Sequence, residues 1–294
     1  MIRSAMFYIN KEKAGVFDAV ASCEALCREK GIRSYFFSRD MKDMKRQLPL
    51  VAQNCRTLDA PDPQVIDALF VFGGDGTVLR ALNLYGSLDL PILGVNLGRM
   101  GFLLETEVSE LDEALTLLAQ GDYEIEHKIM LSVSVYSEGR CVSARAINEV
   151  SISRGLSQRM IALDALAGGM LVDHYIADGL VLASPTGSTA YSLSAGGPIV
   201  SPDVRCFVLN PICPHSLQSR PVVLSSDIEV ILRVNMKEQR EGICLAVDGR
   251  EICHMKNHDE AVVRRSEHDA LLIRFKKNQN FFSLLKEKLS QWSL

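Results

Sequence analysis

The sequence has no long apolar run: none approaches the ~18 consecutive residues that a membrane-spanning helix needs. The first ten residues contain one arginine and a short apolar stretch, without the long apolar segment and small-residue cleavage site of an export leader. The eight cysteines are dispersed and no two have C-x-x-C spacing, which argues against a disulfide-stapled scaffold. We therefore expect reduced thiols, no membrane partner and a cytoplasmic location.

The sequence also has no excess of one charge. Its 32 Lys and Arg residues nearly balance 36 Asp and Glu residues, so the basic surface of a nucleic-acid binder is not expected. Hydrophobic residues make up 47% of the chain, which is enough for a large core and excludes a disordered protein. At about 150 residues per domain, the 294 residues predict two domains.

The first third of the chain alternates between two hydrophobic periods. Short apolar runs predict buried strands at 6–9, 32–37, 67–72 and 91–95. Spacing of three and four residues predicts helices at 16–27, 78–84 and 110–120. Gly31 and Gly121 are expected to end two of these helices, and Ser109 with Asp112 resembles a capping box. This alternation predicts a Rossmann-like α/β domain with a parallel sheet over residues 1–124.

Further along the chain the spacing changes to two residues. Alternating runs predict strands at 130–137 and 141–152, and further strand-like runs lie at 160–166, 179–183, 228–234, 242–247 and 270–275. Helical periodicity is almost absent here, so we expect these strands to be antiparallel. We therefore predict a β-rich domain, a β-sandwich, over residues 125–276. Helical spacing returns at 281–289, and we expect residues 277–294 to form a helix that packs back on the first domain.

A glycine-rich segment, Gly73-Gly74-Asp75-Gly76-Thr77, lies between a predicted buried strand and a predicted helix. Glycine tolerates positive φ, so backbone N–H groups can turn toward one point, and the helix start adds the positive end of its dipole. We predict a phosphate cradle formed by Gly73, Gly74, Gly76 and Thr77. A plain strand–helix turn with Asp75 as the helix cap is the alternative, and the P-loop signature is absent.

Asp75 is unexpected inside a phosphate cradle, because a carboxylate repels the ligand. Its presence makes sense if it helps to hold Mg²⁺ or accepts a proton from an attacking hydroxyl. Asp75 is therefore a candidate for either of these two roles.

Two further segments have the composition of a sugar and base site. Residues 184–198 are rich in small hydroxyl side chains and include Tyr191 as a stacking surface, although a solvated loop has the same composition. Asn148 and Glu149 interrupt an alternating strand, either as a strand end or as ligand-binding groups. In the second case Glu149 would accept hydrogen bonds from ribose hydroxyls.

These segments together resemble the bacterial NAD kinase family. The resemblance rests on the glycine segment 73–77, the Asn148–Glu149 pair and the run from Asp178 to Pro198. The segment 97–103 is similar to that family's Gly-x-x-Gly-Phe-Leu turn, and 214–221 is similar to its late active-site loop. The glycine loop alone is shared with diacylglycerol and sphingosine kinases and loosely with phosphofructokinases, whereas the run 184–191 is far more specific.

The resemblance implies transfer of the γ-phosphoryl group of ATP to the 2′-hydroxyl of the adenosine ribose of NAD, giving NADP, with Mg²⁺ or another divalent metal on the ATP. It implies that Asp75 accepts or orients the hydroxyl proton, and it names no protein ligand for the metal beyond Asp75. It implies a homodimer or homotetramer whose β domains complete one another's sites. The implied NAD-binding residues are Asp75, Gly76, Arg80, Phe102, Asn148, Glu149, Arg159, Ile176, Asp178, Thr189, Ala190, Tyr191, Ser192, Leu193 and Ser194.

One position departs from the family pattern. Many members carry a basic residue two positions before the Asp-Gly pair, where this chain has Ile176. Arg159, Arg154 or Arg80 would then supply the charge that meets the substrate phosphates, or all three are surface arginines. Two alternative functions remain at this point, a lipid kinase with the same glycine loop and a non-catalytic NAD(H)-sensing module.

Overall fold

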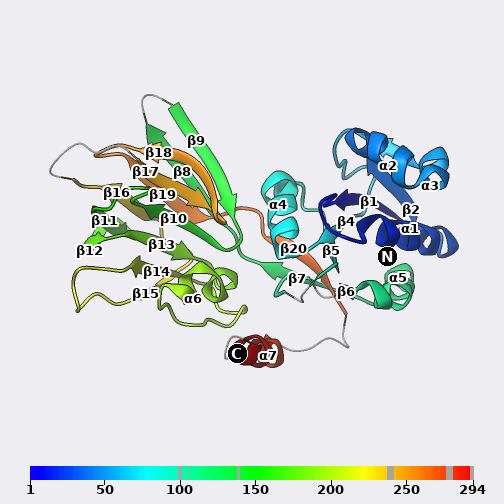
Figure 1. Cartoon of the computed structure of the whole chain (residues 1–294). Helices are drawn as coiled ribbons and strands as arrows, with labels where there is room; N and C mark the ends of the chain where they lie inside the picture. The colour runs from blue at the N-terminus through cyan, green and yellow to red at the C-terminus, as the bar shows by residue number, and fades with distance from the viewer. Residues whose placement is uncertain (99–100, 105, 138–139, 237–241, 276–280, 292–294) are drawn as a thin grey trace. The chain divides into compact units, whose positions relative to one another are not determined.

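The computed structural model describes residues 1–98, 101–104, 106–137, 140–236, 242–275 and 281–291. The chain divides into two compact units (Figure 1). Unit 1 comprises residues 1–127 and 270–294, and unit 2 comprises residues 128–269. No helix within the described ranges is long and apolar enough to cross a membrane.

Unit 1 is built on one sheet of eight strands. In chain order these are β1 (Ser4–Ile9), β2 (Arg33–Phe37), β3 (Arg56–Leu58), β4 (Ala68–Gly73), β5 (Ile92–Asn96), β6 (Thr106–Glu107), β7 (Glu124–Lys128) and β20 (Ala270–Arg274). The strand order is β3-β2-β1-β4-β5-β20-β7, with β6 paired to β5. The pairs β1–β2, β1–β4, β4–β5 and β5–β20 are all parallel, which confirms the predicted α/β sheet.

Within the described ranges, five helices of unit 1 lie between its strands in the chain, and a sixth, α7, follows the last strand, β20. They are α1 (Val16–Glu29), α2 (Met41–Gln47), α3 (Pro49–Asn54), α4 (Asp75–Tyr85), α5 (Leu111–Gln120) and α7 (Phe281–Gln291). Gly31 and Gly121 have φ values of 73° and 83°, so the predicted ends of α1 and α5 are confirmed. The predicted cap of α5 is wrong: the capping box joins Glu107 and Glu110 on a 3₁₀ turn, and α5 begins at Leu111.

Aromatic rings fill the centre of the unit 1 core. The ring of Phe7 lies 5.0 Å from that of Phe36, 5.7 Å from that of Phe70 and 5.1 Å from that of Phe72, and all four side chains are buried. Offset and tilted rings at such separations add to the free energy of burial. This packing fixes the end of β4, where the glycine segment begins.

Unit 2 consists of two antiparallel sheets of six strands. The first sheet has the order β15-β14-β13-β10-β17-β18, and the second has the order β12-β11-β16-β19-β8-β9. The strands are β8 (Leu131–Ser137), β9 (Arg140–Ala146), β10 (Glu149–Ser153), β11 (Ile161–Ala167), β12 (Met170–Ala177), β13 (Gly179–Ala183), β14 (Cys206–Ile212), β15 (Val222–Ser225), β16 (Val230–Val234), β17 (Ile243–Val247), β18 (Arg250–Met255) and β19 (Glu260–Arg265). Inward side chains of both sheets form one apolar cluster. Alternate positions are buried along β16 and β17, whereas β10, β13 and β14 are buried at successive positions.

Two strand predictions are wrong in detail. The run 270–275, predicted as antiparallel, contains β20, which pairs with β5 in the parallel sheet of unit 1. Its four consecutive apolar residues, 270–273, are typical of a parallel strand covered on both faces. The run 141–152, predicted as one stretch, is divided between β9 and β10, and Ile147 and Asn148 form the break.

Candidate functional site

The glycine segment lies where the sequence predicts it, at the carboxyl end of β4. Gly74 is the N-cap residue of α4 and Asp75 is the first helical residue, so the alternative of Asp75 as helix cap is wrong. The hydroxyl of Thr77 accepts hydrogen bonds from the backbone N–H of Gly74 (3.3 Å) and from the side-chain amide of Asn10 (3.2 Å). The start of α4 therefore lies beside the loop that follows β1.

The reason for glycine in this segment differs from the predicted one. Gly73, Gly74 and Gly76 do not have positive φ. At Gly73 the constraint is space, because a Cβ atom there would lie 2.2 Å from the Thr77 hydroxyl. Close approach of backbone and hydroxyl, rather than a left-handed turn, shapes this part of the cradle.

Asp75 is held by a turn from another part of unit 1. Its Oδ2 accepts a hydrogen bond from the N–H of Phe102 (2.8 Å), and its Oδ1 accepts one from the N–H of Leu103 (3.2 Å). A Cβ atom on Gly101 would lie 1.9 Å from Asp75 Oδ1. The turn at 101–103 therefore fixes the carboxylate in one orientation and excludes any side chain at residue 101. Arg99 and Met100 of the predicted family turn lie outside the described residues.

A pocket of about 680 Å³ opens in front of the glycine segment. Asp75, Gly76 and Thr77 line it together with four cationic side chains: Lys11, Lys13 and Arg39 from other segments, and Arg80 from α4 itself. The acidic side chains of Glu12 and Asp40 also line it. Because Gly74 to Thr77 line the pocket, the start of α4 borders it with the positive end of the helix dipole. This combination suits a ligand that carries several negative charges.

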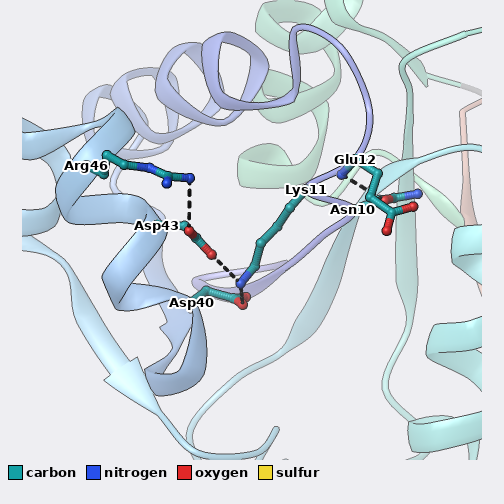
Figure 2. A network of polar contacts seen from close by, with 6 residues as sticks. All are labelled: Asn10, Lys11, Glu12, Asp40, Asp43 and Arg46. Atoms are coloured by element: carbon teal, nitrogen blue, oxygen red, sulfur yellow. Dashed lines mark hydrogen bonds and ion pairs between the residues drawn. The ribbon is translucent and has the colours of Figure 1, made fainter.

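Lys11 borders the same pocket, and its charge is already balanced (Figure 2). Its Nζ lies 2.8 Å from an oxygen of Asp40 and 2.7 Å from an oxygen of Asp43. Burial lowers the pKa of Lys11, but hydrogen bonds to these two carboxylates raise it, and the net pKa lies above the ordinary value. Arg46 approaches Asp43 from its other side at 3.3 Å. Lys11 thus has a structural role: it links the segment after β1 to Asp40 and Asp43 at the edge of the pocket.

In unit 2, a buried turn presents Asn148 and Glu149. The carboxylate of Asp248 accepts hydrogen bonds from the backbone N–H groups of Ile147 (3.1 Å), Asn148 (2.8 Å) and Glu149 (3.2 Å). Asp248 precedes Gly249 in the hairpin between β17 and β18, with φ values of 47° and 73°. We did not predict Asp248, although its Asp-Gly pair is a hairpin signal in the sequence.

Glu149 is buried, and its Oε2 has no hydrogen-bond partner among the described residues. Burial raises the pKa of Glu149 from 4.5 to about 7, the charge of Asp248 adds to the rise, and a backbone hydrogen bond from Tyr191 opposes it. A buried carboxylate oxygen without a donor is costly and rarely kept unless a ligand satisfies it. Glu149 thus has the properties of a binding group.

The raised pKa of Glu149 leads to a prediction for stability. Between pH 4.5 and about 7 the folded protein keeps a proton that the unfolded chain has lost, so stability falls as the pH rises through this window. The loss amounts to roughly 3 kcal/mol. We expect Glu149→Gln to raise the melting temperature by several degrees at pH 8 and to have little effect at pH 5.

The control for this prediction is Asp227→Asn, which changes an exposed carboxylate in the same unit. Thermal melts of both variants and the wild type at the two pH values provide the measurement. A difference between Glu149→Gln and wild type that is the same at pH 5 and pH 8 contradicts the assignment.

The hydroxyl-rich segment at 184–198 contains short helical turns, whereas a solvated loop was one of the two predictions for it. Residues Thr186–Thr189 form a 3₁₀ turn and α6 (Tyr191–Ser194) follows. The backbone N–H of Ser184 donates to the carbonyl of Asn148 (2.8 Å), so this segment lies against the Asn148–Glu149 turn. Ser188 is fully buried and bonds backbone carbonyls, whereas Tyr191 is 43% exposed.

Unit 2 also brings Tyr191 near two acidic side chains. Burial raises the pKa of Tyr191, and the charges of Cys213, Glu149 and Asp178 add to the rise. The remaining implied residues of this segment differ in exposure: Thr189 and Ser192 are buried, Ala190 and Leu193 are half-buried, and Ser194 is exposed. Ser192 has a buried hydroxyl with no partner among the described residues.

Many family members have a basic residue at the position of Ile176, and the three arginines expected to replace its charge, Arg154, Arg159 and Arg80, lie in different places. Arg154 is in an ion pair with Asp178, with Nε 2.7 Å from Oδ1. Arg159 is exposed in the loop before β11, and Arg80 lines the pocket of unit 1. Ile176 itself is 48% exposed.

Both units match one family over most of their length. Residues 4–123 match the ATP-NAD kinase N-terminal domain, and residues 147–275 match the ATP-NAD kinase C-terminal domain. The NAD kinase of Moorella thermoacetica is 40% identical over 262 residues, 88% of this chain and 83% of that protein. The NAD kinase of Geobacter metallireducens is 41% identical over 228 residues, 77% of this chain and 80% of that protein.

Two solved structures share the fold. The crystal structure of an NAD kinase from Archaeoglobus fulgidus in complex with ATP has a TM-score of 0.71 at 25% identity, covering 96% of this chain and 97% of that one. The crystal structure of yeast NADH kinase complexed with NADH has a TM-score of 0.87 at 23% identity, covering 98% of this chain and 88% of that one. The predicted fold class is therefore confirmed.

Proposed function

Since the chain belongs to the NAD kinase family, we propose that its glycine segment and its Glu149 region hold the two substrates of one phosphoryl transfer. The reaction is that of an NAD kinase: the γ-phosphoryl group of ATP passes to the 2′-hydroxyl of the adenosine ribose of NAD, and NADP and ADP result. The observation that carries the assignment of the site is the fixed carboxylate of Asp75 at a pocket lined by four cationic side chains.

On the ATP side, the phosphates occupy the pocket of unit 1. Gly74, Gly76 and Thr77 line it at the start of α4, where a helix N-terminus favours an anion, and Gly73 precedes them at the end of β4. Arg80 lines the same pocket and supplies positive charge to the phosphates. Phosphoryl transfer depends on positioning and on neutralising charge more than on covalent chemistry, and this pocket provides both.

Asp75 acts at the acceptor hydroxyl. An ionised carboxylate has about four acceptor positions, and two of them take the N–H groups of Phe102 and Leu103. The others can accept a hydrogen bond from the ribose 2′-hydroxyl and aim its oxygen at the phosphorus. A carboxylate is a weak base, and a loose transition state does not require a strong one.

Mg²⁺ is expected to arrive with ATP. Within the part of the chain that the structure describes, no group of three or more His, Cys, Asp or Glu side chains could hold a metal ion. Mg²⁺ in kinases is commonly held by one or two protein oxygens and by substrate phosphates, which fits Asp75, the carboxylate within the glycine segment that lines the pocket. When bound, the ion neutralises charge on the phosphates.

On the NAD side, the unpartnered Oε2 of Glu149 accepts hydrogen bonds from ribose hydroxyls. Asn148 precedes Glu149 in the turn, and Tyr191, the first residue of α6, donates its backbone N–H to the Glu149 carboxylate. We place α6 on the adenine side. We place Asp178 at the nicotinamide end, and Arg159, Ile176 and Phe102 complete the set that the family resemblance implies. The lipid-kinase alternative shares only the glycine segment, whereas the family match at 147–275 lies outside it.

We further propose that the protein works in the cytoplasm as a homodimer or homotetramer. Supporting the assembly, several large apolar side chains of unit 2 are exposed: Leu156, Met170, Leu171, Ile176 and Leu217. Three of them, Met170, Leu171 and Ile176, lie on β12, which is an edge strand of its sheet and can therefore pair with another chain. Sedimentation that returns a monomer excludes this assembly.

The direct test of the function is product formation. The purified protein with Mg²⁺-ATP and NAD is expected to form NADP and ADP in equal amounts, detected by an NADP-specific dehydrogenase assay and by chromatography. Omitting NAD is the control for ATP hydrolysis. Failure to form NADP with ATP or with inorganic polyphosphate contradicts the kinase assignment, and NAD binding without product would favour the sensing module.

A further inference from the structure

The turn that holds Asp75 is itself held from its other side. Arg274, at the end of β20, donates from Nη1 to the carbonyl of Leu103 (3.3 Å) and from Nη2 to the carbonyl of Phe102 (3.5 Å). The same two residues donate their N–H groups to Asp75. Asp75 and Arg274 therefore bind the same two residues, Phe102 and Leu103. Asp75 accepts hydrogen bonds from their N–H groups, and Arg274 donates hydrogen bonds to their carbonyl groups.

The hydrogen bonds to Asp75 and to Arg274 are coupled through the peptide bond between Phe102 and Leu103. The carbonyl of Phe102 and the N–H of Leu103 belong to the same planar peptide unit and point in opposite directions. Fixing the carbonyl on one side therefore fixes the direction of the N–H on the other side, which Asp75 Oδ1 accepts. A rotation of this plane would move the donor away from the carboxylate.

Arg274 is itself fixed in place. Its Nε lies 2.7 Å from an oxygen of Glu126 on β7, and its side chain is only 16% exposed. The planar guanidinium can bond a carboxylate with one edge and two carbonyls with the other nitrogens, which the single ammonium of lysine cannot do in the same geometry. Arg274 thus connects the turn at 101–103 to two strands of the sheet, β20 and β7, and restricts its movement.

We propose that Arg274 is a positioning residue for phosphoryl transfer, acting through the turn at 101–103 on the orientation of the Asp75 carboxylate. This inference rests on the proposed function, and no sequence motif points to Arg274. A misplacement of reacting groups by an ångström costs up to ~10²-fold in rate, and a weakened turn displaces the carboxylate by less than that.

The test is a double-mutant cycle between Arg274→Met and Asp75→Asn. Arg274→Met is expected to lower kcat about tenfold, with KM for ATP and for NAD within about threefold of wild type. In the Asp75→Asn background the same change is expected to have less than about twofold effect, because no acid/base carboxylate remains to be aimed. A general loss of structure would lower kcat by the same factor in both backgrounds.

The matched control is Arg233→Met, which removes a strand arginine paired with Glu260 in unit 2. It is expected to leave kcat near the wild-type value. If Arg274→Met does not fold, Arg274→Lys enters the same cycle, since it keeps the charge and loses the planar fork.

The inference is overturned if the Arg274 variants keep wild-type kcat, or if their effect is the same with and without the Asp75 carboxylate. The function itself is judged separately, since these variants are compared only with a wild-type protein that forms NADP.

Discussion

Asp75→Asn is expected to bind NAD as tightly as the wild type and to lose at least ~10² in kcat. The substitution keeps the size of the side chain and one acceptor oxygen, so one hydrogen bond to the turn at 101–103 survives. The amide cannot accept a proton, and its NH₂ group faces a backbone N–H that now lacks an acceptor. The effect therefore falls on kcat and not on KM.

Steady-state kinetics and equilibrium binding of NAD provide the measurement for Asp75→Asn. The control is Asp112→Asn, which removes an exposed carboxylate paired with Lys30 on the same unit and is expected to keep wild-type turnover. A kcat within about threefold of wild type in Asp75→Asn removes Asp75 from the mechanism.

Gly101→Ala is expected to lower kcat by about as much as removing the carboxylate, on the order of 10²-fold. The new methyl group would lie 1.9 Å from Oδ1 and 2.1 Å from Oδ2 of Asp75, and neither distance is possible between real atoms. The short side chain of Asp75 must move, and in moving it loses its hydrogen bonds to Phe102 and Leu103. The backbone of residue 101 does not require positive φ, so we expect the variant to fold.

Gly98→Ala is the matched control in the same segment of the chain. A Cβ atom there meets only Lys13 Nζ, at 3.9 Å, which is ordinary van der Waals contact. Kinetics of the two variants, with thermal melts to show that both fold, separate displacement of Asp75 from a general effect of adding a methyl group. Equal activity of Gly101→Ala and Gly98→Ala contradicts the steric argument.

The accuracy of the sequence-based predictions depends on whether a feature is local. The strand, glycine segment and helix at 68–85 are consecutive, and their period and composition predict them well. The sequence pattern places the run 270–275 in the wrong sheet because strand pairing is not a local property, although four consecutive apolar residues at 270–273 are a signal of a parallel strand. The division of 141–152 depends on Asp248, about a hundred residues away, which holds the turn at 147–149.

The sequence by itself determined the alternation of strands and helices in the first part, the period-two pattern in the second, and the residue types of the phosphate segment. These follow from backbone geometry and from burial of every second, third or fourth side chain. Only the tertiary structure decided that Phe102 and Leu103 hold Asp75, that Arg274 holds the same turn, and that Glu149 is buried with an unpartnered oxygen. Each of these depends on which distant segments pack together, because hydrogen bonding and desolvation are set by neighbours in space and not by neighbours in the chain.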